Sequence, residues 1–454
     1  MNSAKLITLA DQELLRLFLA IVLLLGAAHT FGYLFQRFKM PRVIGEITGG
    51  VVLGPSLGGF LFPETYAQIF NGFDAEPKLL STIYWLGLVL LMFISGFEIQ
   101  KSINRQERRL ISAILLGGTV MPFLAGWLTP VVYDCSSFVG EKGNLVAFQI
   151  IVGIAVAVTS IPVISKIFLD LNVINTRFAK IIVVAATIED VILWGALAVA
   201  TGIASREQMS LLSISSTVLL SLTFFAVCLF IMPRLMAFGN ELRINVLVRS
   251  SVSGYTLLIC FLFATMASLL GINVVFGALL AGVVVGSMPG KEFANVKTHI
   301  KEVSLGFFIP IYFAIVGLRL DLIHHFDILP LVGFLLFASG LKMGGTLLAA
   351  KLLRQNWLSG INLAVAMNTR GGPGIVLATV AFDLGIISES FFVILVMVSI
   401  LTSLVAGYWF TFVLSKGWDL LAGGPPQRVE QVVTRPAQET PEIASGPAIT
   451  VAGN

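Results

Sequence analysis

The chain of 454 residues is poor in charge, and this shortage limits the class of protein it can be. Only 12% of its residues are charged and 57% are hydrophobic, an apolar share larger than a soluble domain of this size needs for its core. The formal net charge is only +4, so the composition does not indicate binding to nucleic acid. We therefore expect an integral membrane protein.

Cysteine and histidine are also scarce, which argues against a metal centre. The three cysteines, Cys135, Cys228 and Cys260, have neither metal-ligand spacing nor a disulfide pattern, so we expect inert packing residues. Of the four histidines, His29 stands alone in an apolar stretch, and no pair has ligand spacing. We expect no transition metal and no cofactor.

Long apolar runs recur along the whole chain. A helix that crosses about 30 Å of hydrocarbon needs about 20 residues, and about thirteen runs meet this length. They predict an all-α polytopic membrane protein. The expected spans are 14–36, 41–61, 79–97, 110–133, 145–168, 180–203, 211–233, 252–270, 272–288, 303–320, 328–350, 357–384 and 389–415.

The basic residues fall mainly on one side of these spans. Cytoplasmic loops carry the excess of Lys and Arg, and most of the 29 basic residues lie on the side that includes 101–109 and 416–435. This bias predicts that the N-terminus is outside and the C-terminus is cytoplasmic. The first six spans then run opposite to the last six, with the seventh as a link, and such inverted repeats are typical of transporters.

The composition changes near residue 421. Beyond it the chain is rich in Gly, Pro, Gln, Thr and Glu, with too few apolar residues to form a core. We predict a membrane domain over 1–421 and a disordered cytoplasmic tail over 422–454.

Two adjacent acids lie inside the sixth predicted span, where an ionised group costs roughly 2.5–3.5 kcal/mol. Glu189 and Asp190 are about ten residues from its cytoplasmic end, roughly 15 Å deep. Consecutive helical residues point about 100° apart. We expect one carboxylate to line a cavity and the other to meet a neighbouring helix; the alternative is a purely structural ion pair.

Two basic residues lie inside later spans. Lys342 is about eight residues from the cytoplasmic end of the eleventh span, so its alternative role is snorkelling to the interface. Arg370 is near the middle of the twelfth span, too deep for snorkelling, and requires a partner or water inside the bundle. We expect both to act as charge partners of the acids. Glu46 and Glu98 lie near span ends and are expected at the interface.

The fifth and twelfth spans contain helix-breaking residues near their middles. In the fifth, a proline follows Thr159 and Ser160, which removes one backbone donor and frees a carbonyl one turn earlier. The twelfth holds three glycines and a proline within seven residues. Paired breaks at equivalent positions of two halves indicate a midplane binding site. The break residues are Pro162, Gly371, Gly372 and Pro373.

Taken together, these motifs resemble the monovalent cation/proton antiporter superfamily, especially its second family, which includes bacterial sodium/proton and potassium/proton antiporters. The resemblance covers nearly all of residues 14–415. The stretches that carry it are 41–46 with 53–56, 95–98, 159–162, 188–191, 277–282 and 368–371.

The resemblance implies two mobile bodies. A core of helices within about 110–203 and 328–415 would move against a dimerising scaffold within about 14–97 and 252–320, with 211–233 as a linker helix. Two broken helices would cross in the core. The resemblance also implies a homodimer in the bacterial inner (plasma) membrane.

The resemblance further implies roles for three residues. Asp190 matches the family's ion- and proton-binding aspartate, and Lys342 matches the basic residue that pairs with the preceding acid in electrogenic members. That acid is Glu189 here, where many electrogenic members have Asp and electroneutral members have Asn or Gln. The choice between Na+ and K+ and the stoichiometry stay open.

These observations predict a secondary active transporter that exchanges Na+ or K+ for H+ by alternating access. Asp190 would bind the cation and the proton in competition, with oxygens of Thr159, Ser160 and Thr369 coordinating the cation. The alternatives are a cation channel, an organic-anion carrier and a non-transporting membrane sensor. We do not expect an enzyme, because the sequence has no zinc motif and no nucleophile paired with a histidine.

Overall fold

The structure is a computed structural model of the chain. In the part that it describes, the chain is almost entirely helical, and apart from one isolated antiparallel bridge between Val139 and Ile387 no strand is present. Nine helices in this part are long and apolar enough to cross a membrane. The predicted all-α architecture is confirmed. The described residues are 9–38, 40–97, 107–204, 219–220, 223–235, 246–288 and 291–421.

Most predicted spans correspond to long apolar helices. The single helices are α1 (Asp11–Arg37), α5 (Glu76–Phe97), α10 (Arg177–Ala204), α14 (Val252–Leu269), α15 (Val274–Gly286), α18 (Ile328–Leu352) and α21 (Glu389–Ser415). Two further spans are continuous helices with a π-helical turn inside. They are α6 (Arg108–Leu115), η1 (Leu116–Val120) and α7 (Met121–Val132), and α16 (Lys291–Val303), η4 (Ser304–Phe308) and α17 (Ile309–Leu318).

One predicted boundary was wrong, and one predicted span contains a break. The helix expected over 303–320 begins at Lys291. The prediction started too late because the first half of the helix carries charged residues, which a search for apolar runs excludes. The span expected over 41–61 agrees with the apolar span Arg42–Leu61. Within it α2 (Arg42–Leu53) stops before Gly54 and Pro55, since proline cannot continue the helix. Two short helices follow, α3 (Gly58–Leu61) and α4 (Pro63–Phe70).

Several predictions concern residues that are only partly described. Of the span expected over 211–233, the structure describes 219–220 and 223–235, including the π-helical turn η3 (Val227–Ile231). The expected tail over 422–454 and Glu98 lie outside the described residues. The count of thirteen spans and the inverted repeats therefore stay predictions.

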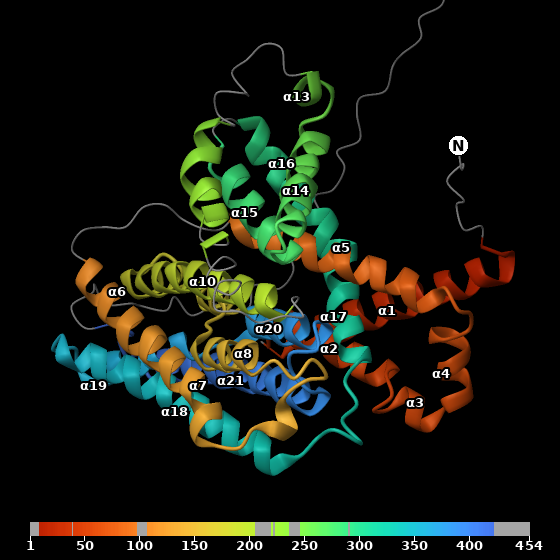
Figure 1. Ribbon diagram of the computed structural model, residues 1–454. Helices are drawn as coiled ribbons and strands as arrows, with labels where there is room; N and C mark the ends of the chain where they lie inside the picture. Colours follow the sequence, from red (N-terminus) through yellow and green to blue (C-terminus); the bar gives the residue numbers. More distant parts are fainter. Residues whose placement is uncertain are drawn as a thin grey trace, which may run out of the picture.

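The helices pack as two sets, which Figure 1 shows at the lower left and at the right and top. In one set α1, α2, α5, α14, α15 and α17 contact mainly one another; in the other α6, α7, α8 (Leu145–Ala157), α10, α18, α19 (Trp357–Met367) and α21 do so. The helices α9 (Ile161–Asp170) and α20 (Gly371–Asp383) join the second set through contacts with α8, α10 and α21.

Glycine allows very close packing in the first set. A Cβ atom on Gly50 of α2 would lie 1.9 Å from the carbonyl oxygen of Ala314 in α17. Only glycine lets the two backbones meet at this distance, as is common where membrane helices pack. The close contact between α2 and α17 therefore requires glycine at position 50.

Candidate functional site

Both predicted helix breaks are present, and they meet each other. Residues 158–160 separate α8 from α9, and residues 368–370 separate α19 from α20. The amide of Ser160 donates to the Thr369 carbonyl at 2.5 Å, and the Thr159 hydroxyl donates to the Met367 carbonyl at 2.6 Å. The backbone groups that the breaks release are thus partly satisfied across the crossing.

The second break depends on glycine at one position. Gly371 has φ +41°, and a Cβ there would lie 2.4 Å from Val163 Cγ2 and 2.7 Å from Ser160 Oγ. A side chain is therefore excluded by backbone conformation and by space. Gly372 differs, because a Cβ there would meet no atom within 4 Å.

The C-terminal end of α8 is capped by two buried cations. The Arg370 guanidinium donates from Nε to the Ala155 carbonyl and from Nη2 to the Val156 carbonyl, both at 3.1 Å. The Lys342 ammonium donates to the Ala157 carbonyl. These carbonyls have lost their helical partners and carry the negative end of the helix dipole. Positive side chains stabilise this end of the helix inside the bundle.

Arg370 was expected as a charge partner of the acids, but its hydrogen bonds go to neutral groups. Besides the α8 carbonyls, its Nη1 donates to Asn368 Oδ1 at 2.9 Å and to Ser339 Oγ at 3.5 Å. The side chain is only 2% exposed. Its contacts therefore hold the shape of the crossing.

Lys342 and Glu189 form a buried ion pair. The ammonium lies 3.1 Å from each carboxylate oxygen, and both side chains are 0% exposed. The snorkelling alternative is therefore excluded for Lys342. The carboxylate accepts a third hydrogen bond from the Thr119 hydroxyl, at 2.5 Å to Oε2.

Thr119 belongs to the π-helical turn η1 and was missed from the sequence. A Cβ on Gly345 of α18 would lie 1.9 Å from the Gly117 carbonyl, so glycine allows η1 to approach α18 next to Lys342. Turns of this kind often occur at functional sites. The only sequence signal was the Gly117-Gly118-Thr119 triplet inside an apolar run.

Asp190 has a different environment from its neighbour Glu189. It is 8% exposed and lines a cavity of about 480 Å³, and its Oδ1 has no hydrogen-bond partner among the described residues. The expectation that one acid lines a cavity and the other meets a neighbouring helix thus agrees with the structure. The cavity walls come from both helix sets and include Glu46, Met92, Ile161, Phe313, Gly372 and Pro373.

Glu46, expected near the interface, is only 3% exposed and lines the same cavity. Arg42 pairs with it at 2.8 Å between Nε and Oε1. The Arg42 guanidinium also donates to His29 Nδ1 at 2.7 Å, so the other ring nitrogen carries the proton and donates to the Gly306 carbonyl at 2.9 Å. Glu46 thus has an ion-pair partner, whereas Asp190 Oδ1 has no hydrogen-bond partner among the described residues.

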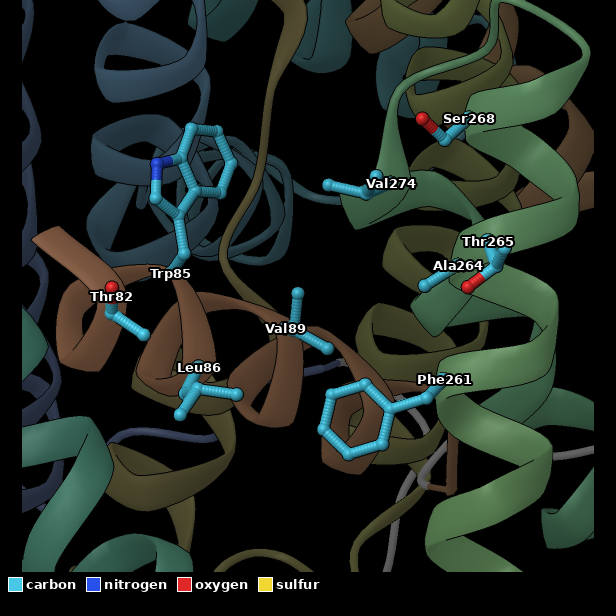
Figure 2. A pocket seen from close by; sticks show the side chains of 9 residues that line it. All are labelled: Thr82, Trp85, Leu86, Val89, Phe261, Ala264, Thr265, Ser268 and Val274. Atoms are coloured by element: carbon cyan, nitrogen blue, oxygen red, sulfur yellow. The ribbon is translucent and has the colours of Figure 1, made fainter. Parts of the chain in front are cut away.

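A second cavity, of about 470 Å³, lies between α5, α14 and α15 (Figure 2). Its walls are apolar apart from three hydroxyls and the indole N–H of Trp85, and no ionisable side chain lines it. It offers no charge to bind an ion, so the cavity at Asp190 is the candidate site. The hydroxyls belong to Thr82, Thr265 and Ser268.

Comparison with known proteins identifies the family. The profile described as "Sodium/hydrogen exchanger, transmembrane" matches residues 20–416. The chain belongs to this family. The resemblance to the monovalent cation/proton antiporter superfamily is thereby confirmed, and the protein is a multi-pass membrane protein in a family of transporters.

Similar proteins include antiporters from bacteria and plants. The chain is 27% identical to the Na+/H+ antiporter NhaS4 of Synechocystis sp. over 87% of its length and 96% of the relative. It is 25% identical to the Na+/H+-K+ antiporter GerN of Bacillus cereus, with 86% and 94% covered. Against cation/H+ antiporter 17 of Arabidopsis thaliana the identity is 28% over 87% of this chain, which spans about half (48%) of that protein.

The fold also matches a solved structure. The sodium/proton antiporter MjNhaP1 of Methanocaldococcus jannaschii aligns with a TM-score of 0.65 at 13% identity, covering 89% of this chain and 99% of that one. At 13% identity the match establishes that the two proteins share a fold.

Proposed function

We propose that the protein exchanges Na+ or K+ for H+ by alternating access, and that Asp190 binds the cation and the proton in turn. The observation that carries the proposal is the Asp190 carboxylate, which is buried at a cavity wall with an oxygen that has no hydrogen-bond partner in the described part of the chain. The names of the Synechocystis and Bacillus relatives support both cations as candidates.

The need to neutralise the Asp190 charge makes the exchange obligatory. A buried, ionised carboxylate is costly and is neutralised either by one proton or by one dehydrated cation. Occupation by one ligand disfavours the other, so the two compete. The site crosses the membrane at low cost only when it is occupied, which suppresses leak.

The Lys342–Glu189 pair leaves Asp190 as the acid that changes its ligand. Lys342 is held by both Glu189 oxygens and by the Ala157 carbonyl, and Thr119 holds Glu189 from the other side. We propose that the pair stays intact through the cycle. One cation is then exchanged for one proton, and the exchange is electroneutral.

Thr159 and Ser160 stabilise the crossing of the two helix breaks next to the cavity. Both are 0% exposed. The Thr159 hydroxyl and the Ser160 amide donate the hydrogen bonds that join the two breaks, and the Ser160 hydroxyl accepts from the Val163 amide at 3.3 Å. We propose that they act together with Arg370 to fix the crossing, and that the cation takes its remaining ligands from the cavity side of Asp190, where Gly372 and Pro373 line the wall.

The two helix sets supply the moving parts. We propose that the set with α6–α10 and α18–α21 is the core and that the set with α1, α2, α5, α14, α15 and α17 is the scaffold of a homodimer. Lys166 and Lys301 line the cavity and belong to the basic side of the spans, so the cavity opens to the cytoplasm. The N-terminus would lie outside and the C-terminus inside the bacterial inner membrane.

The proposal is tested in liposomes that contain the purified protein and a pH-sensitive dye. Addition of Na+ or K+ should release trapped protons, and lithium and rubidium serve to rank selectivity. Because proton and cation compete, the apparent KM for the cation should rise as pH falls while the maximal rate stays the same. Cation flux without proton movement would instead indicate a channel.

A further inference from the structure

A second polar cluster joins the two helix sets far from the Asp190 cavity. We propose that Arg319, Asp383 and Tyr84 form a latch that holds this end closed and separates when the site opens to the opposite side of the membrane. The inference rests on the proposed alternating-access function. Tyr84 lies on α5, Asp383 lies on α20 and Arg319 directly follows α17; these three helices approach each other in Figure 1.

The Asp383 carboxylate is the centre of the cluster, and both of its oxygens are occupied. Arg319 Nη2 lies 2.6 Å from Oδ1, and the Tyr84 hydroxyl donates to Oδ2 at 2.8 Å. Arg319 Nη1 also reaches the Tyr84 hydroxyl at 3.4 Å. Arg319 and Tyr84 belong to the first helix set, and Asp383 belongs to the second. Each of these contacts with the carboxylate therefore crosses between the sets.

Aromatic rings shield the ion pair. The Arg319 Cζ atom lies 5.6 Å from the centre of the Tyr84 ring and 5.2 Å from that of the Phe382 ring. The side chains of Arg319 and Asp383 are 33% and 13% exposed. A cation between two rings and a largely buried carboxylate is less screened than a surface pair. The latch thus has more effect on the equilibrium than an exposed salt bridge.

Asp383 is fixed within the second helix set. It is the last residue of α20, and the turn that follows places Gly385 at φ +65°. The Gly385 carbonyl accepts from the Lys142 amide at 3.1 Å, and the Ile386 carbonyl accepts from the Gly140 amide at 3.0 Å. The loop before α8 therefore braces Asp383, which must move with α8 and α20.

Arg319 is braced in the first set in the same way. It follows α17 directly, and the next carbonyl, of Leu320, accepts from the Ser56 hydroxyl at 2.5 Å. The Ser56 hydroxyl in turn accepts from the Leu322 amide at 3.0 Å. The turn between α2 and α3 thus holds the segment that carries Arg319. If the two helix sets separate, Asp383 therefore moves with the second set and Arg319 with the first, and the ion pair breaks.

The position of the latch gives it a function. The helix α20 begins at Gly371 beside the crossing, and its neighbour Gly372 lines the Asp190 cavity, while Asp383 is the last residue of this 13-residue helix. At 1.5 Å per residue the latch lies roughly 18 Å along the helix axis. One end of the helix borders the open cavity and the other is tied to the scaffold, so opening the far side requires the latch to break.

The test measures access to Thr379, which lies one turn before Asp383 on α20 and is 1% exposed. A Thr379→Cys variant, with the three native cysteines replaced by alanine, is labelled with a maleimide in detergent. In this background Asp383→Asn and Arg319→Gln should raise the labelling rate by about tenfold, the effect of shifting a two-state equilibrium by 1.4 kcal/mol. The charge-swapped pair Arg319→Asp with Asp383→Arg should return the rate toward the parent.

The matched control is Arg177→Gln. Arg177 pairs with Glu107 at 3.5 Å, and both lie at helix starts in the second set, so this change breaks an ion pair without touching the contact between sets. Its labelling rate should equal the parent's. Equal rates in the latch variants and the control, with all proteins folded by thermal melting, would overturn the latch. Because labelling does not depend on transport, loss of cation/proton exchange in the parent would contradict the proposed function alone.

Discussion

The Nζ atom of Lys342 lies 3.1 Å from both carboxylate oxygens of Glu189, and neither side chain is exposed to solvent. This pair stands next to Asp190 in the chain but is separate from the cavity that Asp190 lines. Adjacent acids on one helix thus differ in environment: Glu189 compensates a buried base, whereas Asp190 has an oxygen without a hydrogen-bond partner among the described residues, which we propose binds the ligand.

The buried pair predicts a characteristic pattern of stabilities. Lys342→Met leaves the Glu189 charge buried without its partner, and breaking such a pair costs about 3–5 kcal/mol. Adding Glu189→Gln removes that charge, so the double variant should be more stable than Lys342→Met alone. Thermal unfolding of the parent, both single variants and the double variant in detergent measures the coupling. Additive losses would mean that the two residues do not interact.

An intact pair also predicts that a membrane potential does not drive exchange. Proteoliposomes with a potassium gradient and valinomycin carry a defined potential, and sodium-dependent proton flux is compared with and without it. Equal rates are expected, because in the proposed cycle one cation replaces one proton at Asp190. A rate that follows the sign of the potential would show that Lys342 releases a proton during the cycle.

The two neighbouring glycines at the second break provide a matched pair of variants. Gly371→Ala should reduce exchange strongly and lower the melting temperature, since the new Cβ collides with Val163 and Ser160 at a positive φ. Gly372→Ala adds the same methyl group where no atom lies within 4 Å and should keep its stability. Similar losses of stability in both variants would show that the crossing does not depend on the backbone of Gly371.

Much of this site was predictable because its signals are local. Charged residues in the middle of apolar spans, at Glu189, Asp190, Lys342 and Arg370, are costly and therefore conspicuous. The prolines and glycines of the breaks are visible in the same way. Their helix breaks occur where the sequence placed them.

The contacts between distant segments were not predictable. Arg370 and Lys342 cap the end of α8, yet no pattern in the sequence relates these residues to 155–157. Arg319 and Asp383 lie at helix ends, where charges normally face water, so nothing marked them as a pair. Thr119 is an ordinary residue of an apolar run until the π-helical turn directs it toward Glu189.

The first break has a different basis from the one expected. Pro162 was expected to break the helix by removing a backbone donor, but it lies in the first turn of α9, where that donor has no helical partner anyway. The interruption is also stabilised by the cations that cap α8 and by the hydrogen bonds between the breaks. These are tertiary interactions, which residue spacing alone does not contain.

The central claim is that Asp190 carries both the cation and the proton. The most direct test is sodium- and potassium-dependent proton release from proteoliposomes that contain Asp190→Asn, compared with the parent and with Glu107→Gln, an acid outside the cavity. Asn keeps the size of the side chain but has no charge to be neutralised, so release should fall to the level of empty liposomes, while Glu107→Gln matches the parent. Folded Asp190→Asn protein that exchanges at a substantial fraction of the parent rate would contradict the account.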